Sequence, residues 1–411
     1  MEITEDIVIV GGGIAGLTTS LGLYRLGIKS MVLESSDGLR ITGFAFMVWT
    51  NAWKALEALG IDDSIRQQHK QLHGVLATSL ETGAASELSF EPSATQKGHE
   101  VRCVKRKILM ETLVKELPTG TIRFSSKVVS IEDSGRLKLV HLADGTIIKA
   151  KVLVGCDGVN SVVAKFLGLK KPAFAGRSAF RGYADFDNAH EFEPRFLQYF
   201  GQGVKYGFLP CDDHTVYWFF TYTPSKNDRE MEEDTLNMKQ YVMDHLGEVP
   251  EKIRSVIENT KLNGIVSSPL RFRHPWELLW GNIHKDNVCV AGDALHPMTP
   301  DLGQGGCSAL EDGIVLARCL AEVLKKKPSG KEGEGSDENE YMRIKMGLEK
   351  YANERKWRGF SLISTAYLIG FLQQNDGKLI SFVRDKMLGG FLAGLLMKRA
   401  DFDCGNLNGT T

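Results

Sequence analysis

The stretch DIVIVGGGIAG, residues 6–16, joins a short β-branched run to a turn of three glycines and then to a helical apolar pattern that continues to Leu26. A strand that leads through the GxGxxG spacing into a helix is the signature of a dinucleotide-binding βαβ unit. In such a unit Gly11 permits the tight turn, Gly13 lets the backbone approach a pyrophosphate, and Gly16 allows the helix to pack closely on the strand. The stretch therefore predicts a nucleotide-binding strand, turn and helix.

An acidic residue after the second expected strand supports this interpretation. That strand covers Lys29–Leu33 and ends at Glu34, where a carboxylate would accept hydrogen bonds from an adenosine ribose. A carboxylate favours an unphosphorylated ribose, as in FAD or NAD, over that of NADP. The helix would present free amide donors and a positive dipole end to the phosphates, around Ile14 and Ala15. Glycine-rich turns alone often bind nothing, so the prediction depends on strand, helix and acid occurring together.

The composition is that of an ordinary globular protein with room for two domains. The chain has 411 residues, of which 43% are hydrophobic and 25% are charged. Its 50 basic and 51 acidic residues give a net charge of -1, so charge predicts no nucleic-acid or anionic-membrane partner. The seven cysteines are scattered and include no CxxC pair, which predicts reduced thiols rather than a disulfide framework or a metal site. The motif starts close to Met1 and no apolar run is long enough to cross a bilayer, so we expect a cytoplasmic protein without a transmembrane segment.

Two more strand-like runs end in acidic turns. One leads into Gly155-Cys156-Asp157-Gly158, and the other leads into Gly292-Asp293. Carboxylates at the carboxyl ends of strands lie in the ligand crevice of an open α/β sheet, so Asp157 and Asp293 are candidate cofactor contacts. An N-cap of the helix expected from about Ser161 explains Asp157 equally well and is compatible with that role.

A loop after Asp293 leads to a second glycine-rich helix start. The segment Gly303–Gly306 precedes a helix expected over Cys307–Leu324, and its amide donors and dipole can stabilise an anion. Two such helix starts, far apart in the sequence, suit one long ligand with a phosphate end and a second electron-rich end. His296 in the same loop could act as a base, but no partner for it is identifiable and a structural role is favoured.

The sequence changes in character between Ser178 and Phe272, where alternating, aromatic-rich strands surround one helical interlude. Arg181 and Tyr217 in this region are candidate substrate contacts, although a structural role explains each equally well. Strand-like runs on both sides of Gly83 interrupt the nucleotide-binding part in the same way. We therefore expect a discontinuous nucleotide domain over residues 1–72, 100–177 and 281–325, a β-rich substrate domain over 73–99 and 178–280, a charged loop over 326–340 and a helical region over 341–411.

The C-terminal region is expected to be helical. Two helices are predicted over about Tyr341–Ser361 and Leu362–Gln373, and an apolar helix is predicted over Phe382–Lys398. Packing of this last helix on the body of the protein is the default. Docking to a membrane surface or to a second subunit is the alternative, so weak membrane contact and a monomer or a homodimer stay open.

The motifs, in this order and at these spacings, resemble those of the group A flavoprotein monooxygenases, the para-hydroxybenzoate hydroxylase-like family. The match covers about residues 5 to 370. Within the family the chain is similar to plant monooxygenases related to zeaxanthin epoxidase and to salicylate- or urate-hydroxylase-like proteins, which indicates plant specialised metabolism. The matching elements are the dinucleotide motif, the arginine that starts a helix beside the FAD pyrophosphate, the DG motif and the GD motif, found at Gly11–Gly16 with Glu34, at Arg106, at Gly155–Gly158, and at Gly292-Asp293 with His296, Pro297 and Pro300.

The resemblance implies an α/β fold with a Rossmann-like FAD-binding domain of the GR2 type, interrupted by a mixed β-sheet substrate domain and followed by C-terminal helices. It implies FAD as cofactor, no metal, molecular oxygen, and NADH or NADPH as a co-substrate without a Rossmann unit of its own. The expected activity is hydroxylation or epoxidation of a small aromatic, polycyclic or isoprenoid substrate through a flavin hydroperoxide, in a site that excludes water. Pro300 resembles the family proline that lines the oxygen pocket, beside Arg181 and Tyr217. The expected FAD contacts are Gly11, Gly13, Ile14, Ala15, Gly16, Glu34, Arg40, Arg106, Val129, Asp157, Asp293, Pro300, Gly303, Gln304, Gly305 and Gly306.

One departure from the family pattern keeps alternatives open. The DG motif usually continues to an arginine linked to NAD(P)H use, and Ala164 stands there instead, so the choice of nicotinamide is open. An FAD-dependent reductase or cyclase without oxygen activation and a flavin-fold carrier protein are the alternative functions. The intact glycine motif with Glu34 and Asp293 argues against a carrier. A flavin halogenase lacks support because Trp276 and Trp280 do not stand in its tryptophan motif.

Overall fold

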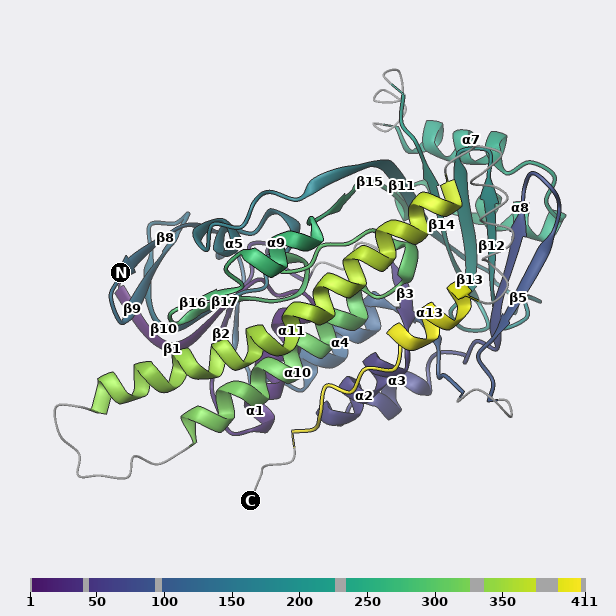
Figure 1. Cartoon of the computed structure of the whole chain (residues 1–411). Coiled ribbons are helices and arrows are strands. Elements are labelled where there is room, and N and C mark those ends of the chain that lie inside the picture. The colour runs from purple at the N-terminus through teal and green to yellow at the C-terminus, as the bar shows by residue number, and fades with distance from the viewer. Residues whose placement is uncertain are drawn as a thin grey trace.

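One mixed sheet is built around the N-terminal strand in the computed structural model, which describes residues 2–39, 44–92, 98–225, 234–325, 336–374 and 391–407 (Figure 1). Its strands are β1 (Glu2–Val10), β2 (Met31–Leu33), β7 (Ile122–Arg123), β8 (Val128–Ser134), β9 (Leu137–Leu142), β10 (Ile147–Gly155), β16 (His284–Lys285) and β17 (Val288–Val290). They follow the order β16-β17-β10-β1-β2-β7, and β9 and β8 branch from β10. The pairs that link β17, β10, β1, β2 and β7 are all parallel.

The motifs meet at one edge of this sheet. In the strand register Val10 lies opposite both Leu33 and Gly155, and Gly155 lies opposite Val290. Four of the five parallel strands, β17, β10, β1 and β2, therefore end side by side. The glycine turn, Glu34 and the two acidic turns that follow them come to the same place, as expected for an open α/β sheet.

Helices cover both faces of this sheet. They are α1 (Ile14–Arg25), α2 (Thr50–Leu59), α3 (Asp62–Arg66), α4 (Arg106–Lys115), α5 (Val162–Phe166), α9 (Pro275–Trp280) and α10 (Gly305–Leu324). Ile7 and Ile9 of β1 pack in one core with α1 and α10, and Val8 and Val10 pack in a second core with α5 and α9. The segment Ile7–Val10 is apolar at every position because a parallel sheet is buried on both faces.

A second, seven-stranded sheet lies beside the first. It comprises β4 (Gly74–Ser79), β5 (Ala85–Ser89), β11 (Ala173–Asp185), β12 (Arg195–Gly201), β13 (Val204–Pro210), β14 (Thr215–Tyr222) and β15 (Ile265–Phe272), in the order β15-β11-β14-β13-β12-β4-β5. One face packs aromatic side chains such as Tyr206 and Phe220 against α7 (Thr235–His245) and α8 (Glu251–Asn259). The other face looks toward β3 (Ala45–Val48), which pairs with β6 (Arg102–Lys105).

The C-terminal helices join the two sheets. In Figure 1, α11 (Ser336–Gln374) runs along the front of the molecule from the parallel sheet to the seven-stranded sheet, with α13 (Phe391–Arg399) near its far end. The two helices predicted over 341–361 and 362–373 are thus a single helix. Gly359 continues the helix at a place where a Cβ would lie 2.8 Å from Leu278, so this glycine serves close packing and not termination. No helix among the described residues is both long and apolar enough to span a membrane.

Other differences from the predicted elements are local. The sequence pattern predicts one strand over Ile147–Ala150 and another from Lys151, but residues 147–155 form one continuous strand, and β3, α8 and α9 were not predicted. β3 and α9 are short, so their apolar patterns carry little periodic signal. Most of the charged loop expected over 326–340 and the first part of the helix expected over 382–398 lie outside the described residues.

Candidate cofactor and substrate site

The glycine turn has the geometry that a bound pyrophosphate requires. The Gly11 N–H donates to Leu33 O (2.8 Å), and Gly11 has a φ of 104°. A Cβ on Gly11 would lie 2.4 Å from Cys156 O, and one on Gly16 would lie 2.0 Å from Gly11 O. A Cβ on Gly13 would meet nothing within 4 Å. The turn thus packs tightly on the protein at Gly11 and Gly16 but is open at Gly13, on the side where a phosphate would approach.

The start of α1 is free to bind an anion. Gly13 is the N-cap, and no described side chain caps the helix, so the first amides around Ile14 and Ala15 stay available. Glu34 is nearly buried, and its two carboxylate oxygens accept from the N–H groups of Gly12 (2.8 Å) and Ser36 (2.9 Å). This carboxylate therefore lies against the turn, with lone pairs left for ribose hydroxyls.

The acidic DG turn has a structural role in the described contacts. Asp157 accepts from Ser161 Oγ (2.5 Å) and from the Val162 N–H (2.6 Å), so it binds the first amide of α5, whose N-cap is Ser161 and not Asp157 itself. Burial raises its pKa, and these hydrogen bonds oppose that shift. Ser161 in turn accepts from the Ala164 N–H (2.8 Å), and Ala164 is packed in the core. The alanine that departs from the family pattern thus fills an apolar position.

The GD turn lies directly against the first helix. A Cβ on Gly292 would lie 2.8 Å from the Cβ of Ala15, and Asp293 beside it is exposed. Arg106 is the first residue of α4, and its backbone N–H donates to Phe44 O (2.7 Å). Burial lowers the pKa of Arg106, and the charge of Asp293 opposes this shift. Its Nε is buried and has no acceptor among the described residues, which fits a site for an anionic or hydrogen-bonding ligand group.

The second glycine-rich helix start lies under β3. A Cβ on Gly303 would lie 2.8 Å from Met47 Cε, and one on Gly306 would lie 2.6 Å from the ring of Phe46. Gln304 is buried, and its Oε1 accepts from Asn51 (2.8 Å), whereas its Nε2 has no partner among the described residues. The amides of Gly305 and Gly306 therefore begin α10 between β3 and the loop at Pro300.

The candidate substrate residues line two adjoining cavities. Arg181, Tyr217 and Pro300 border a cavity of about 90 Å³ between the seven-stranded sheet and the Pro300 loop. Tyr217 and Ala45 also border a larger cavity of about 560 Å³. Arg181 donates to Ser268 Oγ (3.1 Å), and burial raises the pKa of Tyr217 to about 12, so this phenol stays protonated.

A buried charge cluster behind the GD turn was not predicted. Asp312 of α10 accepts from the Gly292 N–H (2.6 Å), from His296 Nε2 (2.6 Å) and from Arg355 Nε (2.5 Å). Burial raises the pKa of Asp312, but His296 and Arg355 outweigh this and hold it at about 2. His296 is fully buried, which agrees with the favoured structural role, and its partner lies 16 residues away. The sequence signal that could have indicated this cluster is the acidic pair Glu311-Asp312 inside an otherwise apolar helical segment.

Two further expected cofactor contacts are Arg40 and Val129. Arg40 lies outside the described residues. Val129 lies at the start of β8, where the strand register shifts, and is half exposed. Nearby, the Ser126 N–H donates to Glu34 O (2.7 Å), so the segment that leads to Val129 passes close to the end of β2.

Comparisons with known proteins agree with this geometry. A family model described as FAD binding domain matches residues 4–332. The chain is 55% identical over 406 residues to Monooxygenase 2 of Arabidopsis thaliana, covering 99% of both, and 28% identical over 318 residues to an FAD-dependent urate hydroxylase of Mycolicibacterium vanbaalenii, covering 75% and 78%. Klebsiella pneumoniae HpxO, solved with FAD and uric acid, has the same fold, with a TM-score of 0.80, 20% identity, and coverage of 98% of this chain and 96% of that one.

Proposed function

The chain belongs to the FAD binding domain family and is an FAD-dependent monooxygenase, and from this premise we propose that it hydroxylates a small ring compound bound in the cavity beneath Pro300. The observation that carries the proposal is that α1 and α10, the two helices with anion-ready starts, both pack on the GD turn: a Cβ on Gly292 would lie 2.8 Å from Ala15 and 3.7 Å from Ala309. Arg181 and Tyr217 border the cavity that opens beside the second start.

The residues around the glycine turn would hold the cofactor. The α1 amides and Arg106 suit the pyrophosphate, and Glu34 suits the ribose. FAD, when bound, supplies the redox chemistry by accepting electrons from NADH or NADPH and activating oxygen. The α10 amides at Gly305 and Gly306 can stabilise negative charge next to the cavity. In the proposed division, residues 1–72, 100–177 and 281–325 bind FAD, and 73–99 and 178–280 bind the substrate.

The protein walls would control what reaches the reacting atoms. Phe46, Leu209 and Phe219 line the same cavity as Arg181, so most of its surface is apolar. Such walls exclude water, which protects a reactive oxygen donor and favours a flat ring. Of the polar residues in this lining, Arg181 and Tyr217 are the ones that we propose orient that ring; the others include Lys205 and Asp301, which pair with each other. The urate hydroxylase among the relatives also acts on a ring compound, according to its name.

The location and assembly of the protein are inferred separately. All seven cysteines are free and buried, which supports the reducing cytoplasm as the compartment. A monomer or a homodimer is expected, and light scattering after gel filtration distinguishes the two.

The first test is the visible spectrum of the purified protein, before and after NADH or NADPH is added in air, with a panel of phenols, purines and carotenoids. A yellow protein that bleaches and recovers, with oxygen uptake that rises sharply for one compound class, supports the proposal. A yellow protein that is reduced without oxygen uptake for any compound would instead indicate the reductase or cyclase. Protein that remains colourless after incubation with FAD would indicate a carrier.

A further inference from the structure

The face of the seven-stranded sheet that carries Arg181 continues well past the proposed ring site. Residues that pair across neighbouring strands point to the same face of a sheet. Cross-strand pairing links Arg181 to Phe219, Gly207, Gln198, Ala77 and Ser86, in this order from β11 to β5. Ala77 and Ser86 therefore extend the wall on which Arg181 stands.

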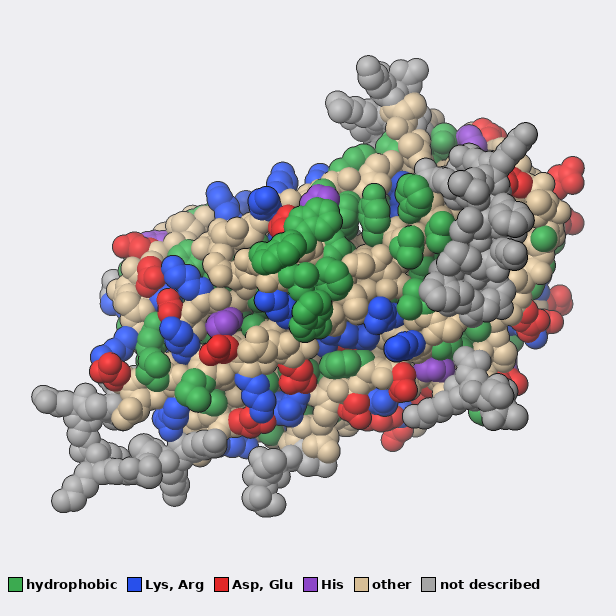
Figure 2. Space-filling view, in the orientation of Figure 1, with side chains coloured by type: hydrophobic (Ala, Val, Ile, Leu, Met, Phe, Trp, Pro, Cys, Tyr) green, Lys and Arg blue, Asp and Glu red, His purple; other side chains and the backbone are tan. Residues whose placement is uncertain are grey.

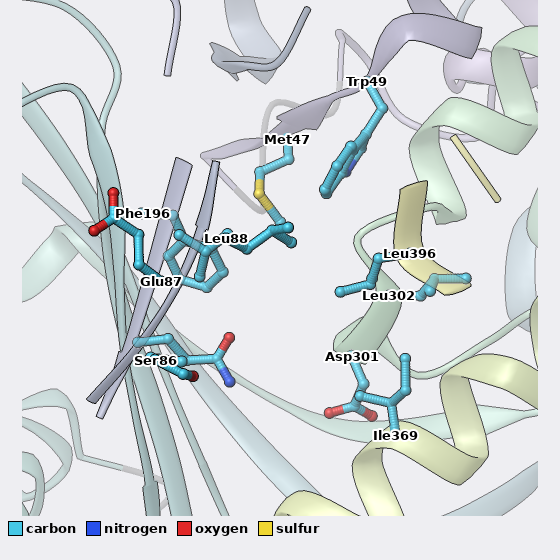
Figure 3. A pocket seen from close by; sticks show the side chains of 13 residues that line it. Met47, Trp49, Ser86, Glu87, Leu88, Phe196, Asp301, Leu302, Ile369 and Leu396 are labelled. Carbon is cyan, nitrogen blue, oxygen red and sulfur yellow. The ribbon is translucent and has the colours of Figure 1, made fainter. Parts of the chain in front are cut away.

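A third cavity, of about 70 Å³, lies over this extension, and we call it the second cavity because it adjoins the 90 Å³ ring site on the side away from the 560 Å³ cavity's residues. Its lining is mostly apolar and comes from β3, the outer strands of the sheet, α11 and α13. In Figure 3 the side chains of Met47, Leu88 and Leu396 project toward its middle, with Phe196 on the sheet side and Leu302 and Ile369 on the opposite side.

The second cavity and the 90 Å³ cavity at Arg181 are neighbours, and side chains separate them. Met47 and Asp301 line both of them. Between them the rings of Phe196 and Phe219 lie with their centroids 6.0 Å apart above Gly207. A Cβ on Gly207 would lie 2.5 Å from Phe196 and 2.9 Å from Phe219, so the glycine makes room for these rings. A ring substituent would therefore reach the second cavity by displacing the Phe196 and Phe219 rings, which stand between the two cavities.

Both carboxylates in the lining of the second cavity are paired with cations, Glu87 with Arg195 and Asp301 with two partners. Asp301 accepts from Arg177 Nη2 (2.7 Å) and from Lys205 Nζ (3.2 Å), and its side chain is almost fully buried. A carboxylate held in this way offers little to a cationic ligand. Most of the remaining lining is apolar, and its buried polar atoms include Trp49 Nε1 and Gln198 Nε2, which have no acceptor among the described residues.

We propose that the second cavity is a subsite for an unbranched or branched hydrocarbon substituent of the substrate whose ring lies beneath Pro300. This inference rests on the proposed function, because it places the ring there. One water-sized group needs roughly 10–15 Å³ of such a volume, so the cavity holds a chain of about five carbons. Burial of each methylene should tighten binding about three- to fourfold until the cavity is full.

The test measures binding of a series from 4-methylphenol to 4-octylphenol to the FAD-loaded protein, by calorimetry and by the change in the flavin spectrum. Affinity is expected to rise three- to fourfold per carbon up to about the pentyl compound and then to level off. Ala77→Phe would fill the subsite, weakening 4-pentylphenol at least tenfold and leaving 4-methylphenol unchanged. Thr78→Phe is the matched control, because Thr78 points to the other face, opposite Tyr199 and Ala85.

The outcomes separate this proposal from the proposed function. Leu396→Trp fills the cavity from the opposite wall and should have the same effect, which covers the case in which Ala77→Phe fails to fold. Affinity that does not change with chain length, or loss of short and long compounds alike in both variants, would overturn the subsite. Chain-length-dependent binding without any oxygen uptake would support the subsite while the monooxygenase function fails. Turnover of these compounds with an affinity that does not change with chain length would support the monooxygenase function while the subsite proposal fails.

Discussion

Gly13 and Gly16 stand three residues apart in one turn but have different surroundings. A Cβ on Gly16 would lie 2.0 Å from Gly11 O, whereas one on Gly13 would meet nothing within 4 Å. We expect Gly16→Ala to lower the unfolding free energy of the cofactor-free protein by about 1–3 kcal/mol, as overpacking does. Gly13→Ala should leave that stability within about 0.5 kcal/mol and still weaken FAD binding, because its methyl group would occupy the side open to the phosphates.

The measurements are urea unfolding of the cofactor-free variants and FAD titration by fluorescence. Equal stability loss in both variants would show that the turn is equally packed at the two positions. Unchanged FAD affinity in Gly13→Ala would remove this turn from the cofactor site.

Arg106 tests the cofactor site through charge. Its Nε is buried without an acceptor among the described residues, which suits a hydrogen bond to an anionic group. A hydrogen bond to a charged group contributes about 1.5–3 kcal/mol, so Arg106→Gln should weaken FAD binding roughly 10- to 100-fold. The matched control is Lys107→Gln, the next residue, whose side chain is 62% exposed. Equal FAD affinity in Arg106→Gln and the control would place the pyrophosphate elsewhere.

Residues close to the motifs could be predicted and residues that depend on distant contacts could not. Glu34 follows its glycine turn by fewer than 25 positions, and one βαβ unit sets both in place. The partner of His296 could not be predicted, because Asp312 lies in a helix whose sequence pattern indicates only that the helix is buried. For Asp157 the sequence left two roles open, a structural one at the start of the helix and a cofactor contact. Its hydrogen bonds with Ser161 and Val162 show the structural role and do not test the cofactor contact.

At the scale of elements, α10 and α11 are joined by buried charges. Arg355 of α11 contacts Asp312 (2.5 Å) and Glu311 (2.7 Å), and Arg358 contacts Glu311 (2.6 Å). All of these groups are nearly or fully buried, so each charge depends on its partners. The continuous helix α11 lets one element reach this cluster and the second sheet, which the two shorter predicted helices would not do.

Breaking this cluster should cost far more than breaking a surface pair on the same helix. Asp312→Asn leaves Arg355 in the core with one carboxylate fewer and should lower the unfolding free energy by about 3–5 kcal/mol. Glu322→Gln is the control, because Glu322 of α10 pairs with Lys350 at the surface, and the expected loss is below about 1 kcal/mol. The urea midpoint decides between them. Similar midpoints would mean that the buried cluster contributes only what a surface pair does.

At the scale of the whole molecule, buried carboxylates tie the segment from Pro300 to α10 to the seven-stranded sheet and to α11. Asp301 binds Arg177 of β11 and Lys205 of β13, and Asp312 binds Arg355 of α11. Arg177 and Asp301 are 124 residues apart, so no local pattern could have predicted their contact. The fold of each sheet was accessible from motif and period, but the way in which the sheets meet was not.

These carboxylates predict how stability depends on acid. Burial raises the pKa of both, but the cations beside them outweigh it and hold Asp301 and Asp312 at about 2. Because these folded-state pKa values lie below the ordinary 3.8, the stabilisation is complete above about pH 4 and is lost as the pH falls toward 2. Each carboxylate contributes on the order of 2 kcal/mol, of which about half is lost by pH 3.

The urea midpoint of the cofactor-free protein should therefore fall between pH 5 and pH 3, and Asp301→Asn should make that fall shallower by about 1 kcal/mol. Asp63→Asn, whose side chain is 90% exposed, is the control. If Asp301→Asn lowers stability equally at both pH values, the Asp301 ion pairs do not carry the acid sensitivity, and the contact between the two sheets must be held by apolar packing instead.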